Sequence, residues 1–251
     1  MTVVQAGAAP TEMEVQVTRV IEDSIAGLSG VLHAMGEADR PPSPPLNLVG
    51  DYGGGAMLLV VGVLAALVEA RTTGQGRVVD AAMTDGAALL GGLFRALRGR
   101  GLWSDRRGSN LLDGGAPFYR CYACRDGGFV AVAALEPRFY AALLAGLEID
   151  PADAVQYDIA AWPALQARLA ALFASRDRDD WSARFAGTEA CVTPVLSLAE
   201  APDHPHNQAR GTFQSGLPQP APRFDGVVAA PSPKSELTLD QMVTKWSDHA
   251  G

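Results

Sequence analysis

The sequence predicts an α/β fold in which a large-domain portion is followed by a smaller α+β domain. Helix-like and strand-like segments alternate between residues 56 and 97, as they do in α/β layers. A polar, glycine-rich stretch then interrupts this pattern, and a hairpin followed by helices begins after it. We therefore expect a large α/β portion at 1–98, a linker at 99–117, a small domain at 118–200, and a connector with a C-terminal helix at 201–251.

The first residues of the large portion show only weak hydrophobic periodicity. Between 15 and 25, the spacing of apolar residues favours a short helix. Prolines between 41 and 45 then enforce an extended approach to the next element. The dense Leu, Val and Ala content of 56–70 predicts a helix buried on most sides. A short buried strand at 77–81 and a second helix at 84–97 complete the α/β alternation.

The second portion opens with a predicted hairpin, because strand-like runs at 118–124 and 129–134 flank a glycine turn. Amphipathic spacing predicts helices at 136–147, 162–174 and 178–185, then a strand at 192–196 and a short helix from 198. The proline-rich stretch 217–233 reads as a connector. Thr238 is suited to cap a last helix at 239–246.

Composition narrows the functional classes. The chain of 251 residues is 48% hydrophobic, enough for a sizeable core, and carries a net charge of -8 with no basic cluster, which argues against nucleic acid as a partner. The start lacks the basic and apolar regions of a secretory signal, and the apolar run at 56–68 is short for a membrane span. We therefore expect a cytoplasmic protein with no membrane partner.

Cysteine and histidine give no strong metal signal. Cys121 and Cys124 form a C-x-x-C pair, which suits redox or metal chemistry, but no second pair follows and the four histidines are scattered. Chance spacing is the alternative interpretation, and we expect no metal site.

Asp51 is the leading candidate for an active-site residue. It precedes Gly53, Gly54 and Gly55 at the predicted start of an apolar helix. In one interpretation Asp51 caps the helix and the glycines permit close packing. In the other, nearby backbone N–H groups and the helix dipole stabilise a developing negative charge on a substrate oxygen beside Asp51. The sequence permits both at once.

Several long strings of the sequence are distinctive. They are PPSPPLNLVGDYGGG at 41–55, GRVVDAAMTDG at 76–86, WSD at 103–105, RGSNLLDGGAPFY at 107–119, LEPRFY at 135–140, TPVLSL at 193–198 and HPHNQARG at 204–211. With these strings the chain resembles the α-methylacyl-CoA racemases of the class III CoA-transferase (CaiB/BaiF-type) family. The resemblance covers most of the chain from about residue 28 onward.

The resemblance implies an enzyme that moves a proton at the carbon next to a thioester. Asp51 matches the family's aspartate base, and Glu136 matches the glutamate that works with a histidine as the opposite base. Asn47 resembles a supporting residue, and the backbone of Tyr52, Gly53 and Gly54 is expected to help hold the substrate. Without the resemblance, the position of Glu136 directly before Pro137 favours a second interpretation, in which Glu136 is simply a carboxylate at the start of a helix.

The sequence also departs from the family pattern. Ile21 stands where the family's catalytic histidine is expected, and an aliphatic side chain cannot transfer a proton. Glu22 and Ile25 occupy neighbouring positions at which the family has cofactor-fixing residues. Relatives also have an upstream nucleotide-binding half that holds the CoA phosphates, so we expect the CoA site of this chain to be largely absent and the large domain to be a remnant.

Three functions therefore remain open. The first is a proton-transfer isomerase, related to the racemases but adapted to isomerisation, elimination or cyclisation, that acts on an acyl thioester or similar carbonyl compound and needs no cofactor. The second is a non-catalytic relative that serves as scaffold or partner of a full-length paralogue. The third is a fragment of a longer racemase. Family members form interlocked dimers, and open parallel strands would need cover, so we expect a homodimer or a heterodimer with the paralogue.

Overall fold

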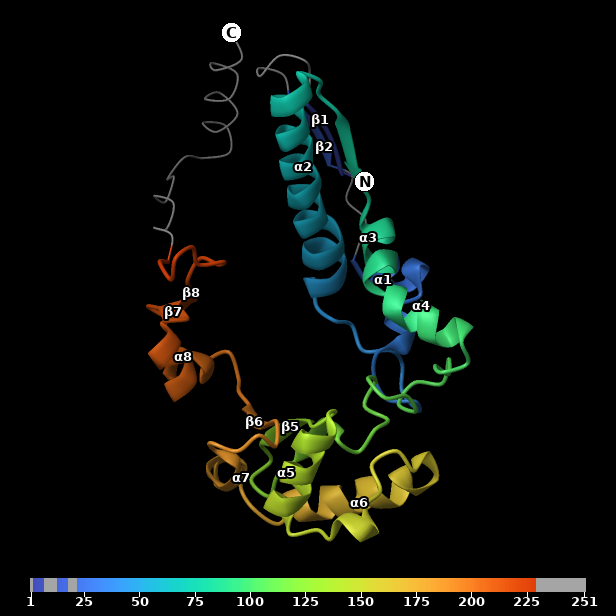
Figure 1. The fold of residues 1–251 in the computed structure, drawn as a ribbon, viewed down its shortest axis with the longest axis vertical. Helices are drawn as coiled ribbons and strands as arrows, with labels where there is room; N and C mark the ends of the chain where they lie inside the picture. Colours follow the sequence, from blue (N-terminus) through green and yellow to red (C-terminus); the bar gives the residue numbers. More distant parts are fainter. Residues whose placement is uncertain (1, 7–12, 18–21, 229–251) are drawn as a thin grey trace. The chain divides into compact units, whose positions relative to one another are not determined.

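The structure is a computed structural model that describes residues 2–6, 13–17 and 22–228. It combines helices with small sheets, as Figure 1 shows. The chain divides into two compact units, residues 1–193 and 194–251. The predicted mixed helix and sheet class is therefore confirmed.

The first sheet has the strand order β2-β1-β3. β1 (Thr2–Ala6) pairs antiparallel with β2 (Met13–Val17) on one side and with β3 (Val78–Ala81) on the other. The expectation of open parallel strands was wrong, because β1 covers an edge of β3 in the antiparallel sense. The predicted helix at 15–25 was also wrong at its start, since MEVQV alternates apolar and polar residues with the period of a strand. α1 (Glu22–Ser29) follows.

The long apolar helix begins earlier than predicted. A π-helical segment, η2 (Leu48–Met57), continues directly into α2 (Leu58–Thr73), which ends at Gly74 with a left-handed φ of 72°. Glycine adopts this conformation without the steric penalty of a Cβ, which explains the end of the helix at that residue.

α2 is not buried on most sides, and that prediction was wrong. Ala66 is the one buried residue that the structure shows within it. Large apolar side chains on the same helix are open to solvent, Leu64 at 57% and Val68 at 67%. The sequence of α2 is apolar on all sides, so its periodicity cannot indicate which face another element covers. Among the described residues, these side chains therefore stay largely open to solvent.

Together the two segments form a helical run of 26 residues, Leu48–Thr73, with a mean hydropathy of 2.0 over its most apolar 18 residues. By length and composition this run could cross a membrane. Only 17% of that window is buried within the structure, less than in a typical core helix. Core helices of soluble proteins share this composition. The expectation of no membrane partner therefore stays a prediction.

Two short helices replace the single helix predicted at 84–97. α3 (Met83–Leu90) and α4 (Gly92–Gly99) are separated at Gly91. α3 packs against η2 and α1, and α1 also contacts the 3-10 turn η1 (Leu32–Ala34). The strand at 77–81 is confirmed as β3, but its burial is not, because Val78 is exposed.

The glycine-rich stretch after α4 contains no helix or strand up to residue 118, as predicted. Asn110, one of the few buried polar residues, orders it. Its amide oxygen accepts a hydrogen bond from the Ser104 N–H at 2.7 Å, and its amide nitrogen donates to the Ser104 carbonyl at 3.0 Å and to Asp113 Oδ2 at 2.6 Å. A segment without regular elements thus satisfies its buried polar groups internally.

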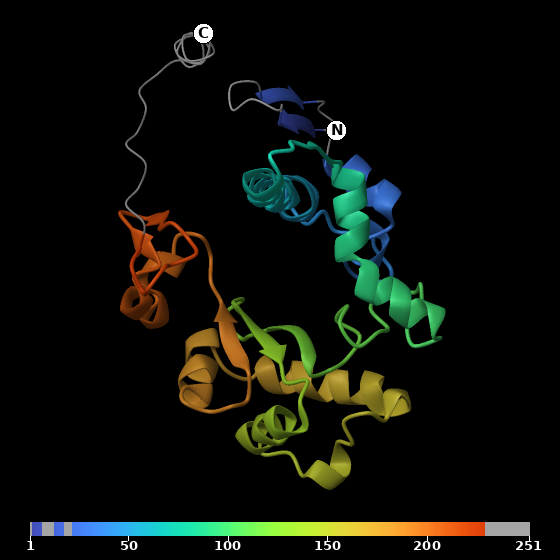
Figure 2. The same cartoon turned by 45° about the horizontal axis from the view of Figure 1, so that its top comes forward.

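The second half of the first unit matches the predicted elements closely. β4 (Tyr119–Ala123) and β5 (Phe129–Ala133) form the expected antiparallel hairpin, and β6 (Val192–Val195) adds to β5. α5 (Pro137–Leu147), α6 (Trp162–Phe173) and α7 (Arg178–Phe185) cover it, with α6 lying along the hairpin in Figure 2. Single 3-10 turns, η3 (Pro151–Asp153) and η4 (Ile159–Ala161), connect α5 to α6.

The main hydrophobic core lies in this half, around the fully buried side chains Phe118, Leu143, Leu169 and Phe173. Phe118 makes edge-to-face contacts with the rings of Tyr140 and Trp162, with centroids 5.2 and 5.7 Å apart. Such geometry matches the ring quadrupoles and adds to the burial of apolar area.

The second unit contains η5 (Ala201–Asp203), α8 (Pro205–Arg210) and the two-residue strands β7 (Phe213–Gln214) and β8 (Leu217–Pro218). The short helix expected from 198 thus begins as a 3-10 turn at Ala201. β7 and β8 pair antiparallel within a stretch partly expected to be a connector. The helix predicted at 239–246 lies outside the described residues.

Candidate active site

Asp51 lies in the first turn of η2, at the start of the long apolar helix as predicted. The residue is half-buried and is followed by the buried glycines Gly54 and Gly55. Within the described part of the chain, no hydrogen bond or ion pair engages its carboxylate. The first turn of a helix leaves backbone N–H groups without intrahelical acceptors and carries a partial positive charge. Negative charge is therefore favoured near this helix start.

The interpretation of Asp51 as the helix cap was wrong. Asn47 occupies the capping position, although its side chain makes no capping hydrogen bond. The Tyr52 N–H donates to the Asn47 carbonyl at 3.1 Å, across five residues, which widens the turn into π-helical geometry. Short π-helical segments are rare and occur frequently at functional sites. The carboxylate of Asp51 is thus not needed to satisfy the helix start.

The other residues expected to support the substrate lie on the same turn. Asn47 and Tyr52 are exposed, Tyr52 at 55%. Gly53 and Gly54 pack tightly, since a Cβ on Gly54 would lie 2.7 Å from the Ala87 backbone nitrogen on α3. The packing role of the glycines is therefore supported, whereas contact of these four residues with a substrate stays a prediction.

Glu136 occupies the capping position of α5 and precedes Pro137 at the first helical position, as the helix-start interpretation predicted. Its side chain is exposed and makes no capping hydrogen bond. The pKa of the nearby Cys191 thiol is raised, mainly by burial and in addition by the negative charge of Glu136. The charge of Glu136 therefore acts on the Cys191 thiol.

Asp51 and Glu136 stand on different elements, η2 and the start of α5. Whether the two carboxylates act in one site stays a prediction.

The cysteines and histidines form no metal site among the described residues. Cys121 is exposed and Cys124 is buried, and both are free thiols. His204 caps α8, where its Nδ1 accepts a hydrogen bond from the His206 N–H at 3.3 Å. Local structure thus accounts for His204.

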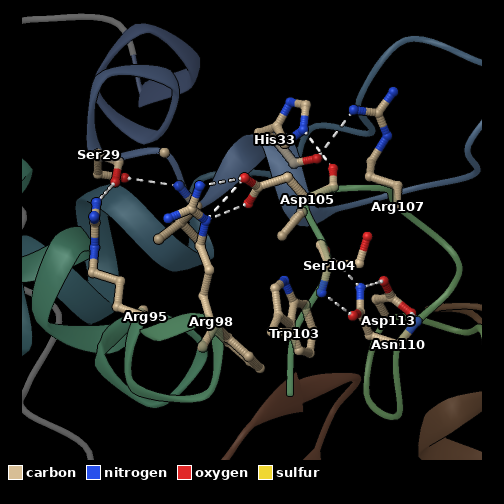
Figure 3. Close-up of a pocket in the computed structure, with 15 residues that line it drawn as sticks. Ser29, His33, Arg95, Arg98, Trp103, Ser104, Asp105, Arg107, Asn110 and Asp113 are labelled. Atoms are coloured by element: carbon tan, nitrogen blue, oxygen red, sulfur yellow. Dashed lines mark hydrogen bonds and ion pairs between the residues drawn. The ribbon is translucent and has the colours of Figure 1, made fainter. Parts of the chain in front are cut away.

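Sequence reasoning did not single out Arg95 and Arg98, which stand on successive turns of α4. With Trp103 they line a pocket of about 370 Å³ that includes neither Asp51 nor Glu136 (Figure 3). The i, i+3 spacing of two arginines on one helix face was the available signal.

Comparisons of the chain with a family profile and with known proteins agree on one family. The profile of "CoA-transferase family III" matches residues 19–235. The chain is 43% identical to the alpha-methylacyl-CoA racemase of Mus musculus over 220 residues, which cover 85% of this chain and 58% of the racemase. Against the alpha-methylacyl-CoA racemase of Homo sapiens it is 40% identical over 215 residues, with 83% and 56% covered. The chain therefore spans less than two thirds of these relatives.

Among solved structures, the fold is similar to that of a CAIB/BAIF family protein from Brucella suis. The TM-score is 0.64 at 23% identity, and the match covers 92% of this chain and 62% of the other. This likeness concerns the fold.

Proposed function

The chain belongs to the CoA-transferase family III, and from this premise we propose that it is a proton-transfer isomerase with Asp51 as base. Its substrate is an acyl thioester or a similar carbonyl compound, and the reaction takes place at the carbon next to the carbonyl. The observation that carries the proposal is the half-buried Asp51 carboxylate, unengaged by any described residue, in the first turn of an apolar helix.

In the proposed step, the Asp51 carboxylate takes the proton from the α-carbon, and the electron pair of the broken C–H bond moves onto the carbonyl oxygen. Backbone N–H groups of the first helical turn stabilise the resulting enolate. Return of the proton from Asp51 restores the substrate with its original configuration. Inversion requires a second group on the opposite face, and Ile21, at the position of the family histidine, cannot supply a proton.

Glu136 is the proposed second group, and it reaches Asp51 from another chain. This assignment is supported by the exposure of Glu136 and by its position on a different element from Asp51. The other chain is a second copy or a full-length paralogue. Within a symmetric dimer, each active site then contains Asp51 of one protomer and Glu136 of its partner.

Deuterium exchange tests the proposal. The purified protein is incubated with a 2-methylacyl-CoA in deuterated water, and incorporation at the α-carbon is followed by mass spectrometry. We expect exchange by the wild-type chain, its loss in Asp51→Asn, and no change in the control Asp39→Asn, which removes an exposed carboxylate from the preceding loop. No exchange by the wild type, or equal rates in the two variants, contradicts the proposal.

A mixing experiment tests whether the site is shared. Asp51→Asn and Glu136→Gln are each inactive for inversion if both carboxylates take part. Random re-assembly of the two variants restores about a quarter of wild-type activity if the site spans two protomers, because half of the dimers carry one intact site. No recovery on mixing means that one chain holds both groups or that Glu136 has another role.

The proposal requires no cofactor, since carboxylates and backbone groups perform the proton transfer. A pantetheine thioester of the same acid tests recognition of CoA. Equal exchange with the CoA and pantetheine thioesters means that the nucleotide part of CoA makes no energetic contribution, as we expect. A strong preference for the CoA ester indicates a nucleotide site on this chain.

The alternative is a non-catalytic relative that acts as scaffold or partner of a full-length paralogue. The exposed apolar side chains of α2 favour it, because they offer a surface for another chain. This function predicts no exchange by the purified chain alone, co-purification with the paralogue, and a change in the paralogue's activity when Glu136→Gln replaces the wild type.

A further inference from the structure

A pocket of about 370 Å³ lies among the turn η1, helix α4 and the loop that follows α4, all within the first unit (Figure 3). Its volume falls at the small end of the range for ligand sites in proteins. The charged and aromatic side chains that line it come from segments more than 60 residues apart. They are His33, Phe94, Arg95, Arg98, Trp103, Asp105, Arg107 and Asp113.

Arg98 and Asp105 neutralise each other inside this lining. Arg98 Nε lies 2.9 Å from Asp105 Oδ1 and 2.8 Å from Oδ2. The hydrogen bond from Arg98 lowers the pKa of Asp105, so its carboxylate stays charged and paired. The backbone carbonyl of Asp105 accepts a hydrogen bond from His33 Nε2 at 2.9 Å, which orients the imidazole.

The guanidinium groups of Arg95 and Arg107 donate their hydrogen bonds to backbone carbonyls and not to carboxylates. Arg95 donates to the Ser29 carbonyl. Arg107 donates to the carbonyls of three residues of the preceding loop at 3.0, 3.2 and 2.8 Å, namely His33, Glu37 and Arg40. Carbonyl groups orient a guanidinium without cancelling its charge. Among the described residues, neither arginine has an ion-pair partner.

The remaining carboxylate, Asp113, is held by the loop. Its Oδ2 accepts from the Asn110 amide at 2.6 Å, and its Oδ1 accepts from the backbone N–H groups of Asn110 and Gly115 at 2.8 and 3.1 Å. Three arginines against two aspartates leave the lining net positive, in a chain whose total charge is -8. Such a local excess attracts anions.

One wall of the pocket is aromatic. The rings of Phe94 and Trp103 pack with centroids 4.8 Å apart and an angle of 45°. Both also line an adjoining pocket of about 330 Å³, whose other side chains include Met35 and Leu112. A ligand that fits both pockets has a charged group and a compact apolar body.

We propose that this pocket binds a small organic anion. Its carboxylate or phosphate group lies against Arg95, and its apolar body packs on Trp103. The site is separate from Asp51, and its occupancy does not depend on the proposed proton transfer. Planar guanidinium groups suit the oxygens of both anion types, so the two chemistries are distinguished by experiment.

Isothermal titration calorimetry of the purified chain, at constant ionic strength, tests the site with four probes. Phenyl phosphate and benzoate carry both features, inorganic phosphate carries the charge alone, and benzyl alcohol the apolar body alone. We expect one equivalent of phenyl phosphate or benzoate to bind, and the stronger of the two identifies the anionic group. Inorganic phosphate and benzyl alcohol bind more weakly than that probe.

Two variants move the affinity in opposite directions. Arg95→Gln removes a charge and weakens binding about tenfold, which corresponds to ~1.4 kcal/mol. Asp105→Asn frees the charge of Arg98 and strengthens binding about two- to fivefold, an effect that loss of folding cannot produce. Arg106→Gln is the matched control, since Arg106 is exposed, stands on the same loop and does not line the pocket.

Several results overturn the proposal. Failure of phenyl phosphate and benzoate to bind excludes the site. Equal affinities in Arg95→Gln and Arg106→Gln place any binding elsewhere, as does an unchanged or weaker affinity in a folded Asp105→Asn. Binding of benzyl alcohol as tight as benzoate shows an apolar site without anion recognition.

Discussion

Gly86 on α3 lies directly against Gly54 on η2, so that the two helical backbones touch without an intervening side chain. A Cβ on Gly86 would fall within the van der Waals radius of the Gly54 carbonyl oxygen. Asp51 stands three residues before this contact, on the same segment. The glycine contact therefore positions the turn that carries the candidate base.

Gly86→Ala should destabilise the first unit, because the added methyl group forces α3 away from η2. Overpacking of this kind lowers the free energy of unfolding by ~1–3 kcal/mol. Gly92→Ala is the control, since a Cβ there meets nothing within 4 Å, and alanine favours helix. Urea unfolding followed by circular dichroism compares the two. Equal urea midpoints for Gly86→Ala and Gly92→Ala would contradict the close contact between Gly86 and Gly54.

Phe118→Ala should remove a central support of the main core. The ring is fully buried and touches Tyr140 and Trp162, so we expect a loss of ~3–5 kcal/mol in the free energy of unfolding. Phe129→Ala on the neighbouring strand removes a ring that is 49% exposed and should cost clearly less. Thermal and urea unfolding measure both variants, and a reversed order would show that the core is centred elsewhere.

Arg107→Met should loosen the loop that precedes η2. The guanidinium joins the carbonyls of His33, Glu37 and Arg40, and loss of these charge-assisted hydrogen bonds lowers the free energy of unfolding by ~1–3 kcal/mol. Hydrogen exchange of residues 33–40 should increase as well. Arg106→Met, the neighbouring control, leaves both quantities unchanged. Unaltered exchange in Arg107→Met is the contrary outcome.

Glu136→Gln should increase the reactivity of Cys191. Burial, and secondarily the charge of Glu136, raises the pKa of this thiol, which lowers its thiolate fraction near pH 8. Removal of the charge lowers the pKa, so iodoacetamide should alkylate Cys191 about twofold faster, and the rate–pH curve should shift to lower pH. Exposed Cys121 is an internal control in the same digest. A rate change shared by both thiols indicates unfolding instead.

Leu64→Lys should disrupt self-association. Met57, Val60, Val61, Leu64, Leu67 and Val68 follow a helical spacing and are all exposed, which gives a stripe suited to a second copy. Light scattering after size exclusion should show a dimer for the wild type and a monomer for Leu64→Lys. Leu198→Lys, at a leucine 96% exposed, is the control. A monomeric wild type that floats with phosphatidylcholine vesicles assigns the stripe to a lipid surface.

Local sequence signals predicted the second half of the first unit well. The hairpin around Gly127 and the helices α5, α6 and α7 have strong periodicity and clear ends, such as Pro137 at the start of α5. The first half was harder, because its strands and helices depend on partners distant in sequence. β3 pairs with β1, more than 70 residues away, and Gly91 divides a continuous helical pattern into α3 and α4.

Contiguous motifs and local periodicity were enough to predict the family, the position of Asp51 at a helix start, and the elements around the main core. The three-dimensional structure was needed to show that β1 covers β3 in the antiparallel sense, that α2 exposes its apolar face, and that Asn47 rather than Asp51 occupies the cap. It also showed that His33, Arg95 and Arg107 line one pocket. The physical reason is that burial, charge balance and strand pairing arise from contacts between residues far apart in the chain.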